Sequence, residues 1–178
     1  MKAAWYTHNG DAQDVMVVGE LPTPSPQAGE VLVRLTTSGV NPSDVKSRRA
    51  RPVTDPLIVP HSDGAGVVDQ VGDGAPAELM GRRVWVYNGQ WERPFGTAAE
   101  YITLPASQVV PLPDGISFEV GASIAIPLMT AMHAVQACGS LLGKTVLVPG
   151  AAGSVGFYAT QCAAIAGARV IGIVSSDE

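Results

Sequence analysis

The chain has 178 residues, of which 46% are hydrophobic and only 15% charged, a balance that excludes a disordered polar chain. Its 20 glycines and 14 prolines exclude a coiled coil, and its two cysteines, Cys138 and Cys162, are too few for a disulfide scaffold. A net charge of −5 gives nucleic acid no basic surface to bind. We therefore expect a compact soluble protein with a sizeable core, located in the reducing cytoplasm.

The first 120 residues are predicted to be mainly β structure. Short runs rich in β-formers, at 31–35, 66–68, 84–87 and 101–104, are each bounded by turn residues. Many short strands at close spacing, without helical periodicity between them, favour a barrel or a sandwich.

A basic cluster interrupts this β pattern. It consists of Lys46, Arg48, Arg49 and Arg51. We expect a solvated loop here, because Asp44 and Asp55 flank the cluster, and a phosphate-binding patch is the alternative.

No targeting or membrane segment is predicted. The N-terminus turns polar directly after Tyr6, unlike a signal peptide. The longest apolar runs, 123–135 and 163–174, fall short of a bilayer-spanning length and contain proline, glycine or arginine.

The periodicity becomes helical from Ser117, which is a good N-cap. Pro127 should kink or split this helix, and Gly139 should end it. A strand at 145–148, a helix at 154–166 and a strand at 169–174 then follow, which predicts a βαβ unit with parallel strands. The predicted organisation is a β-barrel domain at 1–120 and the start of an α/β sheet at 121–178.

The turn inside this βαβ unit is close to the dinucleotide-binding fingerprint, with Ala151, Gly153 and Gly156 in the three glycine places. A side chain at 153 would hold a pyrophosphate away from the backbone, and one at 156 would push the helix from the strand. The open helix N-terminus offers amides and partial positive charge to the phosphates. We predict dinucleotide binding here, and a turn that merely packs is the alternative. The predicted binding residues are Ala152, Gly153, Ser154, Val155 and Gly156.

The end of the second strand indicates which dinucleotide binds. Proteins that prefer NAD place Asp or Glu there to bind the ribose 2′-hydroxyl, whereas this chain has Val174 followed by Ser175 and Ser176. Two hydroxyls without a carboxylate can accept a 2′-phosphate, so NADPH is favoured over NADH. Asp177, a carboxylate close to the same place, weakly favours NADH instead.

Several motifs, in this order along the chain, resemble the zinc-independent quinone oxidoreductase (zeta-crystallin-like) branch of the medium-chain dehydrogenase/reductase superfamily. The resemblance implies a GroES-like β-barrel domain followed by a Rossmann domain, with substrate and nicotinamide bound between the two. The matching stretches are 39–44, 60–68 with Val71 and Gly72, 81–84, 96–101, 127–131 and 150–156.

The resemblance also bears on metal. Zinc-dependent relatives carry a Cys where this chain has Asn41 and a His where it has Ser62, and they add a four-cysteine lobe that this chain lacks. Cys138 and Cys162 are expected to be small buried hydrophobes, and His133 a core histidine. We therefore predict no metal site and no zinc.

The predicted activity is NADPH-dependent hydride transfer to a quinone or an activated alkene (an enone). By resemblance, Asn41 lies beside the nicotinamide as the catalytic candidate, although it can also be only an Asn-Pro turn residue. Thr130 approaches the nicotinamide in relatives, with ordinary helix packing as the alternative. Relatives often have Tyr where this chain has Lys46, which leaves the substrate's size and polarity open.

The sequence is also compatible with other functions. An enoyl reductase, a zinc-free alcohol dehydrogenase and a non-catalytic dinucleotide-binding protein are the alternatives. A complete Rossmann sheet uses about six strands, so we expect the chain to be a fragment of an enzyme of about 320 residues, the length its relatives suggest. The resemblance implies a homodimer for that full-length protein.

Overall fold

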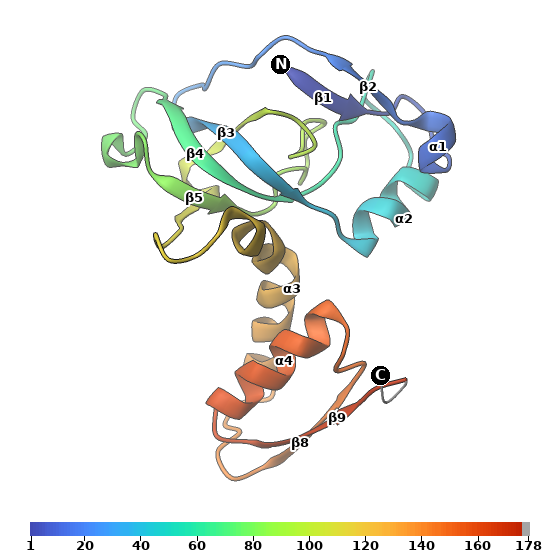
Figure 1. The fold of residues 1–178 in the computed structure, drawn as a ribbon, viewed down its shortest axis with the longest axis vertical. Helices are drawn as coiled ribbons and strands as arrows, with labels where there is room; N and C mark the ends of the chain where they lie inside the picture. The colour runs from blue at the N-terminus through green and yellow to red at the C-terminus, as the bar shows by residue number, and fades with distance from the viewer. Residues whose placement is uncertain (176–178) are drawn as a thin grey trace. The chain divides into compact units, whose positions relative to one another are not determined.

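The computed structural model describes residues 1–175, and the chain divides into two compact units, Met1–Ala125 and Ile126–Glu178. The first unit is built on a five-stranded antiparallel sheet with the order β6-β3-β4-β5-β7. Figure 1 shows β3, β4 and β5 side by side in this sheet. The bounds are β3 (Glu30–Gly39), β4 (Asp63–Val71), β5 (Arg83–Val86), β6 (Tyr101–Pro105) and β7 (Val109–Pro111).

The main hydrophobic cluster of this unit lies on one face of the sheet. Alternate residues of each strand point to that face, and β-branched side chains fill it because they fit a pleated surface. All four predicted strands are confirmed, each within a strand of this sheet except that Tyr87 lies just beyond β5. The buried cluster consists of Val31, Val33, Val68, Val84, Val86, Ile102, Leu104 and Val109.

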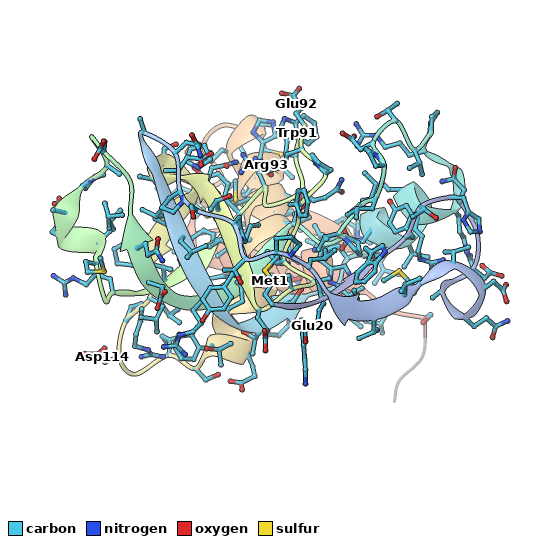
Figure 2. All side chains as sticks on the ribbon, turned by 90° about the horizontal axis from the view of Figure 1, so that it is seen from above. Met1, Glu20, Trp91, Glu92, Arg93 and Asp114 are labelled. Atoms are coloured by element: carbon cyan, nitrogen blue, oxygen red, sulfur yellow. The ribbon has the colours of Figure 1, made fainter. Side chains whose placement is uncertain are left out.

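The N-terminal segment forms a separate two-stranded sheet, in which β1 (Lys2–Trp5) pairs antiparallel with β2 (Val17–Glu20). A short helix, α1 (Ala12–Val15), connects these strands. The α-amino group of Met1 lies 3.3 Å from the carboxylate of Glu20, and Figure 2 labels both residues. Two 3-10 turns, η1 (Ala77–Leu79) and η2 (Ala106–Gln108), complete the unit.

The basic cluster, expected to lie in a loop, lies in helix α2 (Pro42–Ala50) and its C-cap residue, Arg51. Pro42 occupies the first helical turn, where its missing N–H costs nothing. The carboxylate of Asp44 accepts a 2.7 Å hydrogen bond from the backbone N–H of Asn41, which is the N-cap residue. The Asn-Pro-Ser-Asp segment is therefore a helix start, and the Asn-Pro turn considered as the alternative role of Asn41 did not take this capping pattern into account.

The prediction that the basic cluster is solvated is also wrong for Arg48, which is 8% exposed. Its guanidinium donates to the carbonyl oxygen of Gly10, and the neighbouring Arg49 lies 2.8 Å from the carboxylate of Asp11. These contacts tie α2 to the chain segment before α1. Two of the four basic residues are thus structural, while Lys46 and Arg51 are exposed.

Helix α3 (Phe118–Ala137) begins where the sequence predicts, with the Ser117 hydroxyl accepting from the amide of Val120 at 3.4 Å. The helix is not split, because it continues through Pro127. It ends before Gly139, whose φ of 68° is the left-handed conformation typical of a helix stop.

Two expectations for α3 need correction. His133 is exposed and is not a core histidine, and Cys138 just beyond the helix is exposed too. The apolar run 123–135 is by itself too short to span a bilayer, but the helix that contains it begins earlier, at Phe118. Within residues 1–175, this helix is long and apolar enough to cross a membrane. That is weak evidence, because core helices of soluble proteins have the same length and composition.

The second unit contains the predicted βαβ arrangement. Strand β8 (Thr145–Pro149) pairs in parallel with β9 (Arg169–Ile173), and α4 (Ser154–Ile165) connects them. Figure 1 shows α4 lying beside the two strands. Gly167, with a φ of 85°, follows the helix and turns the chain back toward β9. Cys162 on α4 is half-buried, so neither cysteine is the fully buried hydrophobe that was expected.

Candidate functional site

Asn41 is buried between the end of β3 and the start of α2, with an exposed fraction of 6%. Its side-chain amide donates a 2.9 Å hydrogen bond to Oδ2 of Asp63, the first residue of β4, which is 1% exposed. Because a carboxylate only accepts, this bond directs Nδ2 toward Asp63 and leaves Oδ1 on the other side of the amide. The orientation of Asn41 is thus fixed by a residue 22 positions away.

A chain of hydroxyl groups extends from Asp63 to the segment before β4. The Thr97 hydroxyl donates to the carbonyl oxygen of Asp63 at 2.6 Å. Ser38 Oγ lies 2.8 Å from Thr97 Oγ1 and 3.0 Å from Nδ1 of His61. The sequence analysis selected none of these four residues as site residues. Their only sequence signal is that they fall within or beside the motifs that carry the family resemblance.

Burial shifts two pKa values in this region. It raises the pKa of Asp44 above its ordinary value of 3.8, although the amide of Asn41 donates to the carboxylate and opposes the shift. It lowers the pKa of His61 below 6.5. The neutral forms of both groups are therefore favoured relative to the same residues in water.

The site offers no donor set for zinc. In residues 1–175, no three His, Cys, Asp or Glu side chains lie where they would share a metal ion. The amide of Asn41 is committed to Asp63, and Ser62 supplies no imidazole or thiolate. Zinc sites in proteins need about four nitrogen, sulfur or carboxylate ligands.

The turn between β8 and α4 is shaped by its glycines. Gly150 has a φ of 67°, a conformation that side chains disfavour. A Cβ on Gly156 would lie 2.1 Å from the carbonyl oxygen of Gly150, so only glycine fits against the end of the strand. A Cβ on Gly153 would meet only that same oxygen, at 3.3 Å, so this position is tight but much more open than position 156. Such a crowded third and more open second position is what a pyrophosphate-binding turn requires.

The N-terminus of α4 has the donors that such a ligand needs. Gly153 is the N-cap and no side chain caps the helix, so the first-turn amides of Ser154 and Val155 have no partner within the helix. Ala152, Gly153, Ser154 and Val155 are all exposed, whereas Gly156 is buried. The turn therefore fits a dinucleotide phosphate.

The remaining predicted binding residues lie in the second unit. Thr130 is exposed on α3, and Ser175 is exposed two residues after β9. Ser176 and Asp177 lie outside the described residues. The binding roles of Thr130 and Ser175 therefore stay predictions.

The aromatic side chains near the site are not all core residues. Trp85 and Tyr87 are half-buried, with ring centroids 5.9 Å apart, while Trp91 and Phe95 are 58% and 43% exposed. Figure 2 shows Trp91 beside Glu92 and Arg93. A cavity of about 240 Å³ opens next to this loop and to α2, lined in part by Tyr6, Ser47, Arg51, Gln90, Glu92 and Arg93.

The sequence and the structure are similar to those of known proteins. The family model for the alcohol dehydrogenase GroES-like domain matches residues 27–114. Quinone oxidoreductase of Rattus norvegicus is 32% identical over 181 residues, which covers 100% of this chain and 54% of the relative. The chain thus spans about half the length of the curated relatives it matches.

Two solved structures are similar over almost the whole chain. A mycobacterial protein complexed with NADPH has a TM-score of 0.84 at 32% identity, covering 99% of this chain and 53% of that one. An NAD-dependent alcohol dehydrogenase has a TM-score of 0.90 at 33% identity, covering 99% and 59%.

The five-stranded antiparallel sheet, followed by a βαβ unit with a dinucleotide turn, places the chain in the medium-chain dehydrogenase/reductase superfamily. The expected fold class, a GroES-like domain followed by the first part of a Rossmann domain, is confirmed. Within this superfamily, the chain is similar to the quinone oxidoreductase branch.

Proposed function

We propose that the chain is part of an NADPH-dependent oxidoreductase that transfers hydride to a quinone or an enone without zinc. The observation that carries this proposal is the turn at residues 150–156. There, Gly156 packs against the strand end while the amides of Ser154 and Val155 stay open. A turn that served only to connect β8 and α4 would not need an uncapped, exposed helix N-terminus.

In this proposal, residues 152–156 bind the pyrophosphate with the amides of Ser154 and Val155 as donors, and the partial positive charge of the first turn of α4 stabilises the phosphates. Ser175 and Ser176 bind the 2′-phosphate through their hydroxyls. The reduced nicotinamide, when bound, supplies the hydride.

The roles proposed for Asn41 and Thr130 come from the family resemblance. Asn41, held by Asp63, presents an amide that neither gains nor loses a proton, so it can orient a neutral ring without changing charge with pH. Thr130 would contact the same ring from α3. With no metal donor set at Asn41, the acceptor must already be electron-poor, as a quinone or an enone is.

A second candidate is an alcohol dehydrogenase that uses NAD, supported by the similarity to a structure of that activity. An enoyl reductase and a non-catalytic dinucleotide-binding protein remain further alternatives. We also propose that the full-length protein is a soluble cytoplasmic homodimer, with its first domain boundary near residue 120.

The test uses the full-length protein, purified and assayed for metal. We expect saturable NADPH oxidation with a panel of quinones and enones, less than one zinc per chain, and no loss of activity in a chelator. Tight NADPH binding without turnover of any acceptor would favour the non-catalytic alternative. Alcohol oxidation with NAD would favour the second candidate.

A further inference from the structure

His61 holds a backbone conformation that is unfavourable for its residue type. Its φ is 77°, in the left-handed region where a side chain crowds the backbone. The surrounding segment enforces this conformation, because the carbonyl oxygen of His61 accepts from the amide of Thr97 at 2.9 Å. On the preceding residue, the carbonyl oxygen of Pro60 accepts from the amide of Ala98 at 3.0 Å. Strained residues that neighbouring contacts fix in this way cluster at functional sites.

The hydroxyl chain next to His61 determines which ring nitrogen carries the proton. The single hydroxyl hydrogen of Thr97 goes to the carbonyl oxygen of Asp63, so Thr97 Oγ1 must accept from Ser38. Ser38 has then used its own hydrogen, and it can only accept from Nδ1 of His61. The neutral ring is therefore the Nδ1–H tautomer, and Nε2 is the nitrogen that gains and loses a proton.

His61 and Asn41 lie at the same end of the β3–β4 ladder. Gly39 and Asp63 are Cα partners in that ladder. Asn41 follows Gly39 by two residues, and His61 precedes Asp63 by two residues. The bond from Asn41 to Asp63 and the chain from Asp63 through Thr97 and Ser38 link the two side chains into one polar network. The imidazole is therefore part of the candidate site that the sequence had represented by Asn41 alone.

We propose that His61 is the proton donor of the reaction, delivering a proton from Nε2 to the oxygen of the reduced substrate. This inference rests on the proposed function, in which a quinone or enone takes up one hydride and one proton. As the hydride bonds to the substrate, an electron pair moves onto the substrate oxygen. That oxygen takes the proton from Nε2, the N–H bond breaks, and the imidazolium becomes a neutral imidazole that solvent protonates again.

The surroundings of His61 suit this role. Nδ1–H remains bonded to Ser38 in both protonation states, so the ring keeps its orientation while Nε2 titrates. Burial lowers the pKa of His61, which makes the imidazolium a stronger acid. The other titratable group of this network, the Asp63 carboxylate, accepts from Asn41. The hydroxyl of Ser38, which bonds to Nδ1 of the ring, carries no charge.

The first test reads the tautomer without any assay of activity. In the ¹⁵N-labelled chain, nitrogen–proton correlation spectra above the pKa should show a protonated Nδ1 and a bare Nε2 for His61. Ser38→Ala should shift the population toward the other tautomer, whereas His8→Gln should leave the His61 signals unchanged. A bare Nδ1 in the unsubstituted chain would overturn the inference.

The second test uses the full-length enzyme and separates a chemical role from a structural one. His61→Gly should keep or raise the melting temperature, since glycine accepts a φ of 77°, and His61→Gln is the companion variant that retains a polar side chain. In both, kcat at pH 6 should fall about 100-fold and lose its rise toward low pH. His8→Gln should match the unsubstituted enzyme.

The outcomes separate the two proposals. An active enzyme whose His61 variants keep the original kcat and pH profile would overturn the proton-donor role and leave the proposed function standing. An unsubstituted enzyme that turns over no quinone or enone would overturn both.

Discussion

The side chains of Asn41 and Asp63 are joined by a 2.9 Å hydrogen bond in a place where both are almost fully buried. Asn41 is also the N-cap residue of α2, and Asp63 begins β4. One contact therefore fixes the helix start against the central sheet and orients the amide that we place beside the nicotinamide.

Removing this donor should destabilise the first unit. Asn41→Ala takes a hydrogen bond from a buried carboxylate, and we expect unfolding free energy to fall by about 2 kcal/mol. Asn41→Asp should cost more at pH 7 than at pH 4, because two carboxylates would then face each other. Urea unfolding at both pH values measures the difference, with the exposed Ser43→Ala as the control. Equal losses at both pH values would contradict the contact.

Arg48 and Arg49 are adjacent but should differ in their effect on stability. Arg48→Ala removes a buried guanidinium that donates to the backbone of Gly10, and we expect a loss of about 2–3 kcal/mol. Arg49→Ala breaks an exposed pair with Asp11 and should cost about 0.5 kcal/mol or less. Chemical unfolding of the two variants makes the comparison. Similar losses would show that the burial of Arg48 carries no extra stability.

Asp44 should make stability fall as the pH rises. Burial raises its pKa in the folded protein above the ordinary 3.8, so the folded state binds the proton more tightly than the unfolded state. The stabilisation is present below pH 3.8 and is lost as the pH rises through the raised value. Asp44→Asn keeps an acceptor for the amide of Asn41 and removes the charge. We expect it to flatten this part of the profile and to be no less stable at pH 7.

A matched variant tests the capping role of Asp44. Asp44→Ala loses the acceptor and should be less stable than Asp44→Asn by about 1 kcal/mol at pH 7. Thermal unfolding across pH 3 to 7 measures both effects. A steeper profile in the Asn variant would contradict the direction of the pKa shift.

The two glycines of the dinucleotide turn should separate binding from folding. Gly153→Glu needs a shift of only a few tenths of an ångström at the Gly150 carbonyl oxygen, and it should leave the circular dichroism spectrum unchanged while abolishing the fluorescence enhancement of NADPH. Gly156→Ala would place its Cβ 2.1 Å from the Gly150 carbonyl oxygen and should destabilise the second unit by about 3 kcal/mol. Unchanged NADPH binding in Gly153→Glu would show that the phosphate site lies elsewhere.

The preference between cofactors should depend on the residues after β9. Replacing Ser175 with Asp and Ser176 with Ala introduces a carboxylate that repels a 2′-phosphate and can bind a ribose hydroxyl. We expect the ratio of the dissociation constants for NADH and NADPH to fall at least tenfold, measured by fluorescence titration of each nucleotide. An unaltered ratio would remove these residues from the 2′-phosphate site.

Most of the regular structure was predictable because it is locally encoded. The strands around Val33 and Val84 and the βαβ unit around Gly156 are visible as periodicity and turn chemistry within a few residues. Helix α2 carried an equally local signal at Asn41 and Asp44, which the prediction of a loop at the basic cluster overlooked. The buried state of Arg48 had no such signal, because its partner, Gly10, is 38 residues away in the sequence.

The choice of Asn41 as a candidate site residue came from the family resemblance. By itself, the sequence determined the strands of the first unit and the dinucleotide turn. These depend on side-chain size, backbone freedom and spacing, which neighbouring residues set. Only the tertiary structure decided that Asn41 is held by Asp63, and that Ser38 and Thr97 fix the proton on Nδ1 of His61. Hydrogen bonds are directional and short, so they form only where the folded sheet brings β3, β4 and the segment around Thr97 to the same place.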